Sequence, residues 1–285
     1  MNDVPHDTRL SPALYVVATP IGNLGDITLR ALDTLKGVDR VAAEDTRVSG
    51  QLLAHFGIRK PLVSIREHNE REAAERVIGW IAAGEAVAYV SDAGTPAISD
   101  PGARLVAAVR AAQCAVVPVP GVSAVATALS AAGVESDAWL FRGFLPPRPG
   151  ARQAALQALA ALPCALVCYE APHRIVETLA DMAQVFGDAR TVTLARELTK
   201  QFESIVTLPL ADVDAWFAGD ANRARGEFVV VVHAPADLLT AGDAEALRVL
   251  DILAGELPPT LAAKLAAKIT GRTKAELYRM RLKQT

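Results

Sequence analysis

Residues 87–104 read VAYVSDAGTPAISDPGAR. The first four residues are apolar and predict a buried β-strand, whereas Ser91 and Asp92 begin a loop rich in glycine, proline and aspartate. A helical pattern follows the loop. Open α/β sheets bind their ligands at the carboxyl ends of the strands. The stretch therefore predicts an α/β fold with a ligand site directly after this strand.

The segments around this stretch repeat its order of strand and helix. Strands are predicted at 13–20, 41–44, 87–92 and 115–121, and helices at 27–37, 69–85, 101–113 and 123–133. Repeated strand–helix units imply right-handed crossovers and a mostly parallel sheet. The first α/β domain is expected to span residues 12–137, after a flexible tail at residues 1–11.

The stretch RGFLPPRPGARQ (142–153) interrupts this rhythm and indicates a domain boundary. Strands are predicted beyond it at 164–172, 190–199, 204–209 and 226–234, with a helix at 173–187. Several of these strands are joined closely enough to pair antiparallel. A second α/β domain with a mixed sheet is therefore expected at 138–236, and a linker with a small helical appendix at 237–285.

The composition limits the class of protein. A net charge of −3 over 285 residues argues against indiscriminate binding of nucleic acid, although it leaves room for a local basic patch. No uncharged apolar run approaches the roughly 20 residues of a membrane span, and the first residues show no signal pattern. The three cysteines, Cys114, Cys164 and Cys168, are expected to be buried thiols. A soluble cytoplasmic protein is expected.

Three loops that follow predicted strands are candidates for ligand binding. They are TPIGNLG (19–25), DAGTPA (92–97) and VPGVSA (119–124), and none is a Walker A or GxGxxG sequence. Small residues in the second loop would let a ligand contact backbone amides. Asp100 is expected to cap a helix that Pro101 initiates, which would explain it without a ligand. A plain strand-to-helix turn is the alternative for the first loop, and a helix cap at Ser123 is the alternative for the third.

Charged residues gather at four places. Glu44, Asp45 and Arg47 follow one strand, residues 66–70 (REHNE) follow another, Glu170, His173 and Arg174 follow a third, and Arg196, Glu197 and Lys200 follow a fourth. Cations at the start of a helix oppose its dipole, so His173 and Arg174 indicate a function. Solvated loops with local ion pairs are the alternative reading. The sequence contains no HxH or HExxH pair, so no metal site is expected.

The last two dozen residues are basic. Lys264 and Lys268 are one helical turn apart, and Leu261, Leu265 and Ile269 are expected to form an apolar stripe beside them. An amphipathic helix with a basic face suits contacts to nucleic-acid phosphates, while a merely solvated face is the alternative. Sites for a small molecule and for phosphates on one chain suggest an enzyme that acts on RNA.

Taken together, these stretches resemble the tetrapyrrole methylase superfamily, and within it the bacterial enzymes that methylate the ribose 2′-hydroxyl of a cytidine in small-subunit (16S) ribosomal RNA. The matching stretches are ATPIGNLGDITLRAL, AAEDTR, EHNE, VSDAGTPAISDPG, PGVSA, LSAAG, GFLP, YEAPHR, ARELTK and GEFVVVV. They run in order along most of the chain. The combination of SDAGTPAISDPG with YEAPHR is the most specific part of the resemblance.

The resemblance implies S-adenosylmethionine bound in a cleft between two α/β domains, in a homodimer. The residues that it implies for the cofactor are Pro20, Ala93, Gly94, Thr95, Ile98, Ser123, Ala124, Glu170, Leu198 and Glu227. The wider superfamily carries Gly-Asp-Pro where this chain has Gly94-Thr95-Pro96. The cofactor contact of that aspartate must therefore be replaced or lost here, which also weakens a tetrapyrrole-modifying assignment.

The implied reaction is an in-line displacement of methyl from a sulfonium to a ribose hydroxyl, which chiefly requires alignment. A positioned carboxylate or histidine would help by accepting the hydroxyl proton, and Glu44, Asp45 and His173 are unranked candidates. Asp100 is set below them because of its expected capping role. The residues expected to hold phosphates of the small-subunit ribosomal RNA are Arg47, Arg174, Arg196, Lys200, Lys264, Lys268, Arg272 and Lys274.

Two other functions stay open from the sequence. A small-molecule methylase acting on a corrin or porphyrin would need a deep trough between the domains and would leave the basic tail unexplained. A non-catalytic RNA-binding module would have no need of loops shaped for a cofactor. The identity of the target nucleotide, and whether the substrate is free RNA or an assembled subunit, do not follow from the residues.

Overall fold

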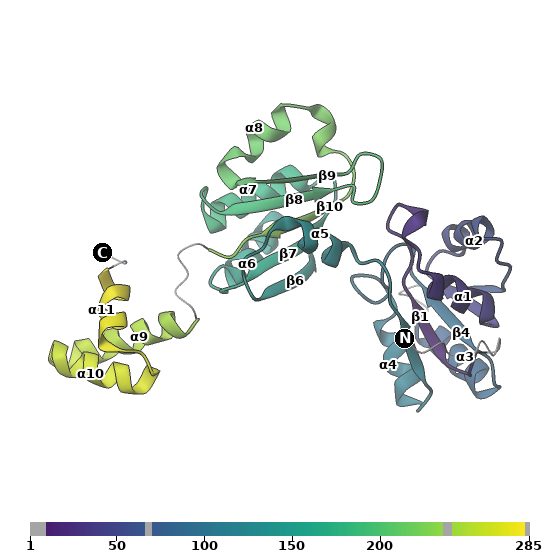
Figure 1. The fold of residues 1–285 in the computed structure, drawn as a ribbon, viewed down its shortest axis with the longest axis horizontal. Helices are drawn as coiled ribbons and strands as arrows, with labels where there is room; N and C mark the ends of the chain where they lie inside the picture. Colours follow the sequence, from purple (N-terminus) through teal and green to yellow (C-terminus); the bar gives the residue numbers. More distant parts are fainter. Residues whose placement is uncertain (1–9, 66–69, 236–240, 283–285) are drawn as a thin grey trace.

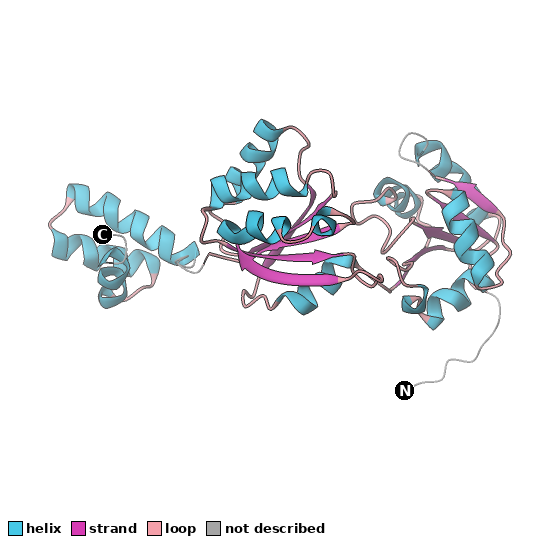
Figure 2. Cartoon of the chain, turned by 90° about the horizontal axis from the view of Figure 1, so that it is seen from above, coloured by secondary structure: helices cyan, strands magenta, loops and turns pink. Residues whose placement is uncertain are grey.

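The computed structural model describes residues 10–65, 70–235 and 241–282 of the chain. It contains two five-stranded sheets and a cluster of helices near the C-terminus. Figures 1 and 2 show these three parts in succession along the long axis of the molecule. The predicted fold class, two α/β units with a helical appendix, is confirmed. Within the described residues, no helix is both long enough and apolar enough to cross a bilayer.

The first sheet has the strand order β3-β2-β4-β1-β5, and its strands are all parallel. The strands are β1 (Leu14–Val17), β2 (Arg40–Ala43), β3 (Leu62–Ser64), β4 (Val87–Val90) and β5 (Val116–Val119). The helical segments are η1 (Leu24–Asp26), α1 (Leu29–Gly37), α2 (Thr46–His55), α3 (Glu70–Ala82), α4 (Ala103–Ala111) and α5 (Ala124–Ala132). The predicted parallel sheet is confirmed, and β3 was not anticipated.

Strand β4 shows why this sheet is buried on both faces. Ala88 and Val90 pack into a core shared with α1 and α2, while Val87 and Tyr89 pack into a second core shared with α3 and α4. Side chains of a strand alternate between faces, so a continuously apolar strand needs cover on both. The loop after β4 therefore leaves the sheet at its carboxyl edge, between two layers of helices.

Helix α5 leaves this arrangement. It follows β5 in the chain, yet its residues Val125, Ala128 and Ala132 pack against Val167 and Val231 of the second sheet. Its Ala-rich sequence allows close approach to that sheet. The N-terminus of α5, at Ser123 and Ala124, is thereby held between the two sheets. We propose that 12–137 and 138–236 are the two domains, as expected, with α5 as the element that joins them.

The second sheet has the strand order β6-β7-β10-β8-β9 and is mixed, as predicted. Its strands are β6 (Trp139–Phe144), β7 (Ala165–Glu170), β8 (Thr191–Arg196), β9 (Ser204–Pro209) and β10 (Phe228–Val232). The helical segments are α6 (Pro149–Leu159), α7 (Ile175–Phe186), η3 (Leu210–Asp212), α8 (Val213–Ala218) and η4 (Ala221–Ala224). Only β6 and β7 pair in parallel. β6 and α6 were not anticipated, because both overlap the Pro- and Arg-rich stretch at 142–153, which was interpreted as a domain boundary.

The last three helices are α9 (Ala241–Glu256), α10 (Pro259–Thr270) and α11 (Lys274–Leu282). They share a core that includes Ala262, Ala263 and Ala266 of α10. Leu261, Leu265 and Ile269 recur every four residues along α10, yet Leu261 and Ile269 are exposed, because the alanine face packs inward. The short alanine side chains let α9 and α10 approach closely, which longer side chains on that face would prevent.

Candidate active site

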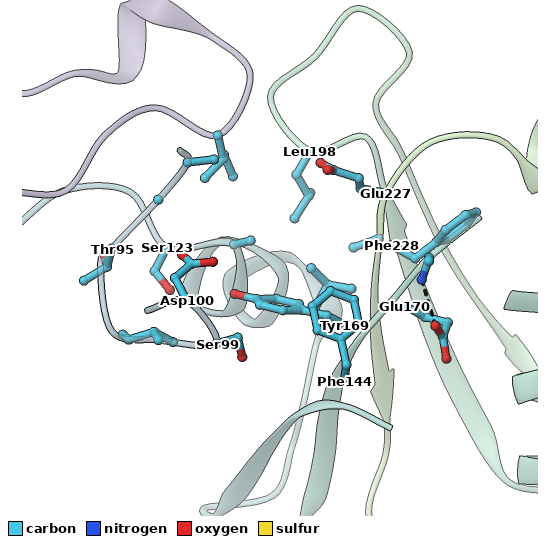
Figure 3. A pocket seen from close by; sticks show the side chains of 18 of the residues that line it. Thr95, Ser99, Asp100, Ser123, Phe144, Tyr169, Glu170, Leu198, Glu227 and Phe228 are labelled. Atoms are coloured by element: carbon cyan, nitrogen blue, oxygen red, sulfur yellow. Dashed lines mark hydrogen bonds between the residues drawn. The ribbon is translucent and has the colours of Figure 1, made fainter. Parts of the chain in front are cut away.

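A cavity of about 310 Å³ lies between the two sheets, at the carboxyl end of β4. Figure 3 shows side chains entering it from the loop after β4, from the start of α5 and from the second sheet. Its lining residues are Ile21, Ala93, Gly94, Thr95, Ile98, Ser99, Asp100, Ser123, Ala124, Phe144, Tyr169, Glu170, Ala171, Pro172, Ala195, Leu198, Lys200, Glu227, Phe228 and Val229. A cavity of this size suits a small organic molecule.

The loop after β4 is fixed by hydrogen bonds to its neighbours. The Thr19 N–H donates to the Gly94 carbonyl (2.9 Å), and the Gly94 N–H donates back to the Thr19 carbonyl (3.1 Å). The Thr95 hydroxyl donates to the carbonyl of Val122 (2.9 Å). Ala97 and Ser99 have positive φ angles of 66° and 65°, which residues other than glycine rarely adopt. Strain of this kind persists where the surroundings over-determine the backbone, and it gathers at ligand sites.

Asp100 does not cap a helix, so the expected explanation for it is wrong. α4 begins at Ala103 and its N-cap is Gly102, with φ of 122°, without a side-chain cap. The two-residue offset frees the Asp100 side chain, which lines the cavity beside Ser123 and Tyr169 (Figure 3). Burial raises the pKa of Asp100, the nearby Asp92 raises it further, and a hydrogen bond with Ser91 lowers it. The cavity therefore contains a carboxylate that is costly to keep charged without a cationic partner.

Tyr169, Phe144 and Phe141 form an aromatic cluster at the cavity. The Tyr169 ring lies edge-on to Phe141 at 5.0 Å and to Phe144 at 5.6 Å between centroids. Burial, followed by the charge of Asp100, raises the pKa of Tyr169 to about 12. Tyr169 and Phe144 were missed as site residues. Tyr169 could have been found from its place beside Glu170 in YEAPHR, whereas Phe144 lies at the end of the unanticipated β6.

Glu170 and Arg174 form a buried ion pair at one wall. The Glu170 carboxylate accepts hydrogen bonds from the Ala171 N–H (2.8 Å) and the Thr178 hydroxyl (2.7 Å), and Arg174 lies at 3.3 Å. The Glu170 side chain is fully buried. Arg174 also donates to the carbonyl of Leu145 (2.8 Å). This carboxylate offsets the cation at the start of α7, so the conflict with the helix dipole has a structural explanation.

Replacing Arg174 by methionine is expected to lower the free energy of unfolding by about 3–5 kcal/mol, because the buried Glu170 carboxylate loses its counter-charge. The double variant R174M/E170Q should recover most of that loss, since no charge is then left unpaired. Urea denaturation of the three proteins measures both effects. A loss below about 1 kcal/mol in the single variant would contradict a stabilising pair and leave Arg174 free for another role.

The residues predicted to bind a cofactor converge on this cavity. All of them line it except Pro20, which lines an adjoining cavity. Pro20 and Glu227 are 207 positions apart in the sequence, and the strand ends of the two sheets bring such distant residues together. Their role toward a cofactor stays a prediction.

The catalytic candidates lie outside the lining of this cavity. Glu44 is half-buried, and burial, followed by the charges of Asp92 and Asp100, raises its pKa. Asp45 caps α2 and pairs with Arg47 at 2.7 Å. His173 is exposed just before α7. Glu44 thus lies within electrostatic reach of the cavity. The EHNE motif begins outside the described residues, at 67–69.

Apart from Arg47 and Arg174, which pair with Asp45 and Glu170, the cations predicted to bind RNA fall into two groups. At the cleft, the Lys200 ammonium bridges the carboxylates of Glu197 and Glu227 (2.9 Å each), and Arg196 donates to the carbonyl of Arg225 (3.4 Å). In the C-terminal helices, Lys264, Lys268 and Lys274 are exposed, and Arg272 is half-buried. The second group is accessible to a large ligand.

Among the described residues, no group of three His, Cys, Asp or Glu side chains is arranged to hold a metal ion. Cys168 is buried, and burial raises the pKa of its thiol. Cys114 and Cys164 are half-buried rather than buried, which corrects the expectation for those two.

Known proteins resemble the chain in sequence and in structure. Residues 13–214 match the family model of tetrapyrrole (corrin/porphyrin) methylases, and residues 240–285 match the RsmI C-terminal HTH domain. A protein of Pseudomonas aeruginosa named "Ribosomal RNA small subunit methyltransferase I" is 54% identical over 95% of this chain and 97% of its own. A relative of the same name in Neisseria meningitidis serogroup B is 49% identical over 97% and 95%.

Solved structures support the fold. A cobalt precorrin-4 methyltransferase aligns with a TM-score of 0.60 at 19% identity, over 78% of this chain and 95% of its own. The uroporphyrin-III-C-methyltransferase of Thermus thermophilus aligns with a TM-score of 0.54 at 21% identity, over 77% and 93%. At these identities the likeness concerns the arrangement of the two sheets.

Proposed function

The chain belongs to the tetrapyrrole (corrin/porphyrin) methylase family, alongside the ribosomal RNA small subunit methyltransferases I, and from that premise we propose that it methylates the ribose 2′-hydroxyl of a cytidine in small-subunit ribosomal RNA. The observation that carries the proposal is the cavity at the end of β4, where a loop of small residues meets the Asp100 carboxylate. In this reaction S-adenosylmethionine would be the methyl donor.

The cavity residues suit S-adenosylmethionine. Gly94, with φ of 75°, and the small residues beside it leave backbone groups open to a ligand. The Asp100 carboxylate lies in the cavity without a cationic partner among the described residues, and a sulfonium or ammonium would supply one. Tyr169 offers an aromatic surface for an adenine ring. Glu170 is held by Arg174, so it would act through its backbone.

The chemistry asks the protein mainly for alignment. When bound, S-adenosylmethionine supplies a methyl group on a positively charged sulfur, and that sulfur leaves as a neutral thioether while the ribose oxygen gains the methyl. The hydroxyl proton needs an acceptor near the cleft. Among the candidates Glu44, Asp45 and His173, Glu44 lies within electrostatic reach of the cavity, and burial raises the pKa of its carboxyl, which makes its carboxylate a stronger base than an ordinary glutamate.

We assign the accessible cations of the C-terminal helices to RNA phosphates. Lys264 and Lys268 share an exposed face of α10, next to Leu261 and Leu265. Arg272 and Lys274 follow at the turn to α11, and Arg47 adds an exposed cation at α2. Arg174, Arg196 and Lys200 are engaged inside the protein, so their part in RNA binding would require them to exchange partners.

The setting of the reaction follows from the same proposal. The substrate is the RNA within the assembled small subunit, the enzyme works in the cytoplasm as a homodimer, and no metal takes part. The exposed Leu261 and Ile269 beside the lysines of α10 support a folded ribonucleoprotein surface as the partner, because apolar and basic contacts then combine.

The test is methyl transfer to small ribosomal subunits that lack their modifications, using methyl-labelled S-adenosylmethionine, followed by nuclease digestion and mass spectrometry. A 2′-O-methylcytidine at one position is expected. The variant K264E/K268E should raise KM for subunits and lower the salt slope by about 1 for each lost phosphate contact, with cofactor affinity unchanged. No transfer despite measurable cofactor binding would overturn the RNA substrate, and a tetrapyrrole acceptor would be tried next.

A further inference from the structure

A second cavity, of about 510 Å³, adjoins the first. The two share Ile21, Ala93, Lys200 and Glu227 in their walls. Its other lining residues are Thr19, Pro20, Gly22, Leu24, Val48, Ser49, Gln51, Leu52, His55, Ser91 and Asp92. The shared wall makes the two cavities neighbouring compartments of one cleft, and the second has room for a nucleoside.

One face of α2 forms a side of this cavity. Val48, Gln51, Leu52 and His55 follow the i, i+3, i+4, i+7 spacing that places residues on one side of a helix. The face combines two apolar side chains with an amide and an imidazole. Val48 is exposed, although a face of this composition is normally covered. Such a mixture suits a flat base that is apolar on its surfaces and polar at its edge.

Ser49 adds an unpaired group. Its side chain is 3% exposed, and its hydroxyl has no hydrogen-bond partner within the described part of the chain. A buried hydroxyl without a partner destabilises the fold, so its place in the wall of a cavity points to a bond made by a ligand. Gln51 is exposed, so its amide is accessible to a ligand that enters the cavity.

The charges of this cavity disfavour a phosphate as its occupant. Asp92 and Glu227 contribute carboxylates, and Lys200 is already paired with Glu197 and Glu227. A phosphate would meet net negative charge here, whereas the ribose and base of a nucleoside carry none. The Asp92 carboxylate also accepts a hydrogen bond from the Asp45 N–H (3.0 Å), which ties this wall to the start of α2.

We propose that this second cavity holds the methyl-accepting nucleoside of the RNA, turned out of its stack, with Gln51 hydrogen-bonding the edge of its base and the Ser49 hydroxyl hydrogen-bonding a different polar atom of the nucleoside. The assignment rests on the proposed RNA methylation and deepens it, because it names the residues that select the acceptor. The 2′-hydroxyl would then lie toward the wall shared by the two cavities, near Ala93 and Glu227.

The variants Gln51→Leu and Ser49→Ala test the assignment. Each should lower kcat/KM for small subunits by about 5- to 150-fold, because one polar group of the bound nucleoside then loses its hydrogen bond. The Kd for S-adenosylmethionine should change less than twofold. Subunits carrying uridine at the target position test selection directly: the wild type should prefer cytidine, and Q51L should lose most of that preference. Gln157→Leu, on an exposed site of α6, is the matched control.

The outcomes separate the two claims. Wild-type transfer at one site, with unchanged activity and base preference in Q51L and S49A, would overturn the acceptor cavity and leave the methylation intact. Absence of transfer by the wild type would overturn the methylation and with it this assignment. A weaker Kd for the cofactor in Q51L or S49A would place these residues in the cofactor site and also contradict the proposal.

Discussion

Asp100→Asn should weaken S-adenosylmethionine binding by about 10- to 150-fold and, in the free protein, raise the free energy of unfolding at neutral pH. The first effect follows from the loss of a charge that faces the cavity, where a cationic ligand would pair with it. The second follows because burial disfavours the charged carboxyl, so a neutral amide of the same shape is easier to bury. If D100N weakens cofactor binding and at the same time raises the free energy of unfolding, Asp100 serves ligand binding at the expense of stability.

The pH dependence has a defined sign. The pKa of Asp100 is raised in the folded state, so protonation stabilises the fold. That contribution is fully present below the ordinary aspartate pKa and is lost as the pH rises through the raised value. The gain from D100N should therefore be largest near neutral pH and shrink in acid. Cofactor affinity of the wild type should fall as the pH drops through the same range, while D100N should be flat.

Isothermal titration calorimetry with the cofactor and urea denaturation of the free protein, each from about pH 4 to 8, measure these effects across the aspartate range. Asp251→Asn, on the exposed side of α9, serves as the control for loss of one carboxylate. If D100N bound the cofactor as the wild type does, Asp100 would have no place in the cofactor site. If D100N were also less stable, its hydrogen bond with Ser91 would outweigh the cost of burial.

Gly102→Ala should produce the largest loss of stability, about 2–6 kcal/mol, from backbone strain and overpacking together. Gly102 has φ of 122°, and an added methyl would overlap the ring of Tyr89. Tyr89 is fully buried in β4 and donates from its hydroxyl to the Pro101 carbonyl at 2.7 Å, so the ring cannot move without breaking that bond. The backbone would shift instead, and Asp100 with it.

The measurement is chemical denaturation of G102A beside Gly133→Ala. Gly133 also has a positive φ, of 63°, but nothing lies near its added methyl, so only about 1–2 kcal/mol is expected there. Cofactor affinity should fall in G102A under conditions where circular dichroism shows a folded protein. Equal losses in the two variants would show that the Tyr89 contact adds nothing beyond the backbone conformation.

The sequence predicted which loops form the site better than it predicted the contacts within the site. The loop at 92–97 and Ser123 follow strands of the first sheet, and the strand ends of an α/β sheet converge on one edge. Recognising those strands was therefore enough to expect that the two loops meet. YEAPHR follows a strand of the second sheet, and only the family resemblance placed it at the same site. The parallel and mixed sheets followed from the same pattern, and the strand β6 was hidden by the prolines and arginines beside it.

Errors arose where a residue had a sufficient local explanation. Asp100 before Pro101-Gly102 has the sequence of a helix cap, yet the helix begins at Ala103 because Gly102 adopts a positive φ against Tyr89. Arg174 reads as an exposed cation, yet Glu170 and the Leu145 carbonyl hold it inside. Partners distant in the chain decided both cases.

By itself the sequence determined the fold class and the order of strands and helices apart from β3, β6 and α6, because hydrophobic periodicity and turn residues act over short distances. The tertiary structure alone decided that Asp100 has no cationic partner among the described residues, which face of α10 is buried, and that α5 closes against the second sheet. These outcomes depend on packing and on charges brought together from separate strands, and no local pattern encodes the energy of such contacts.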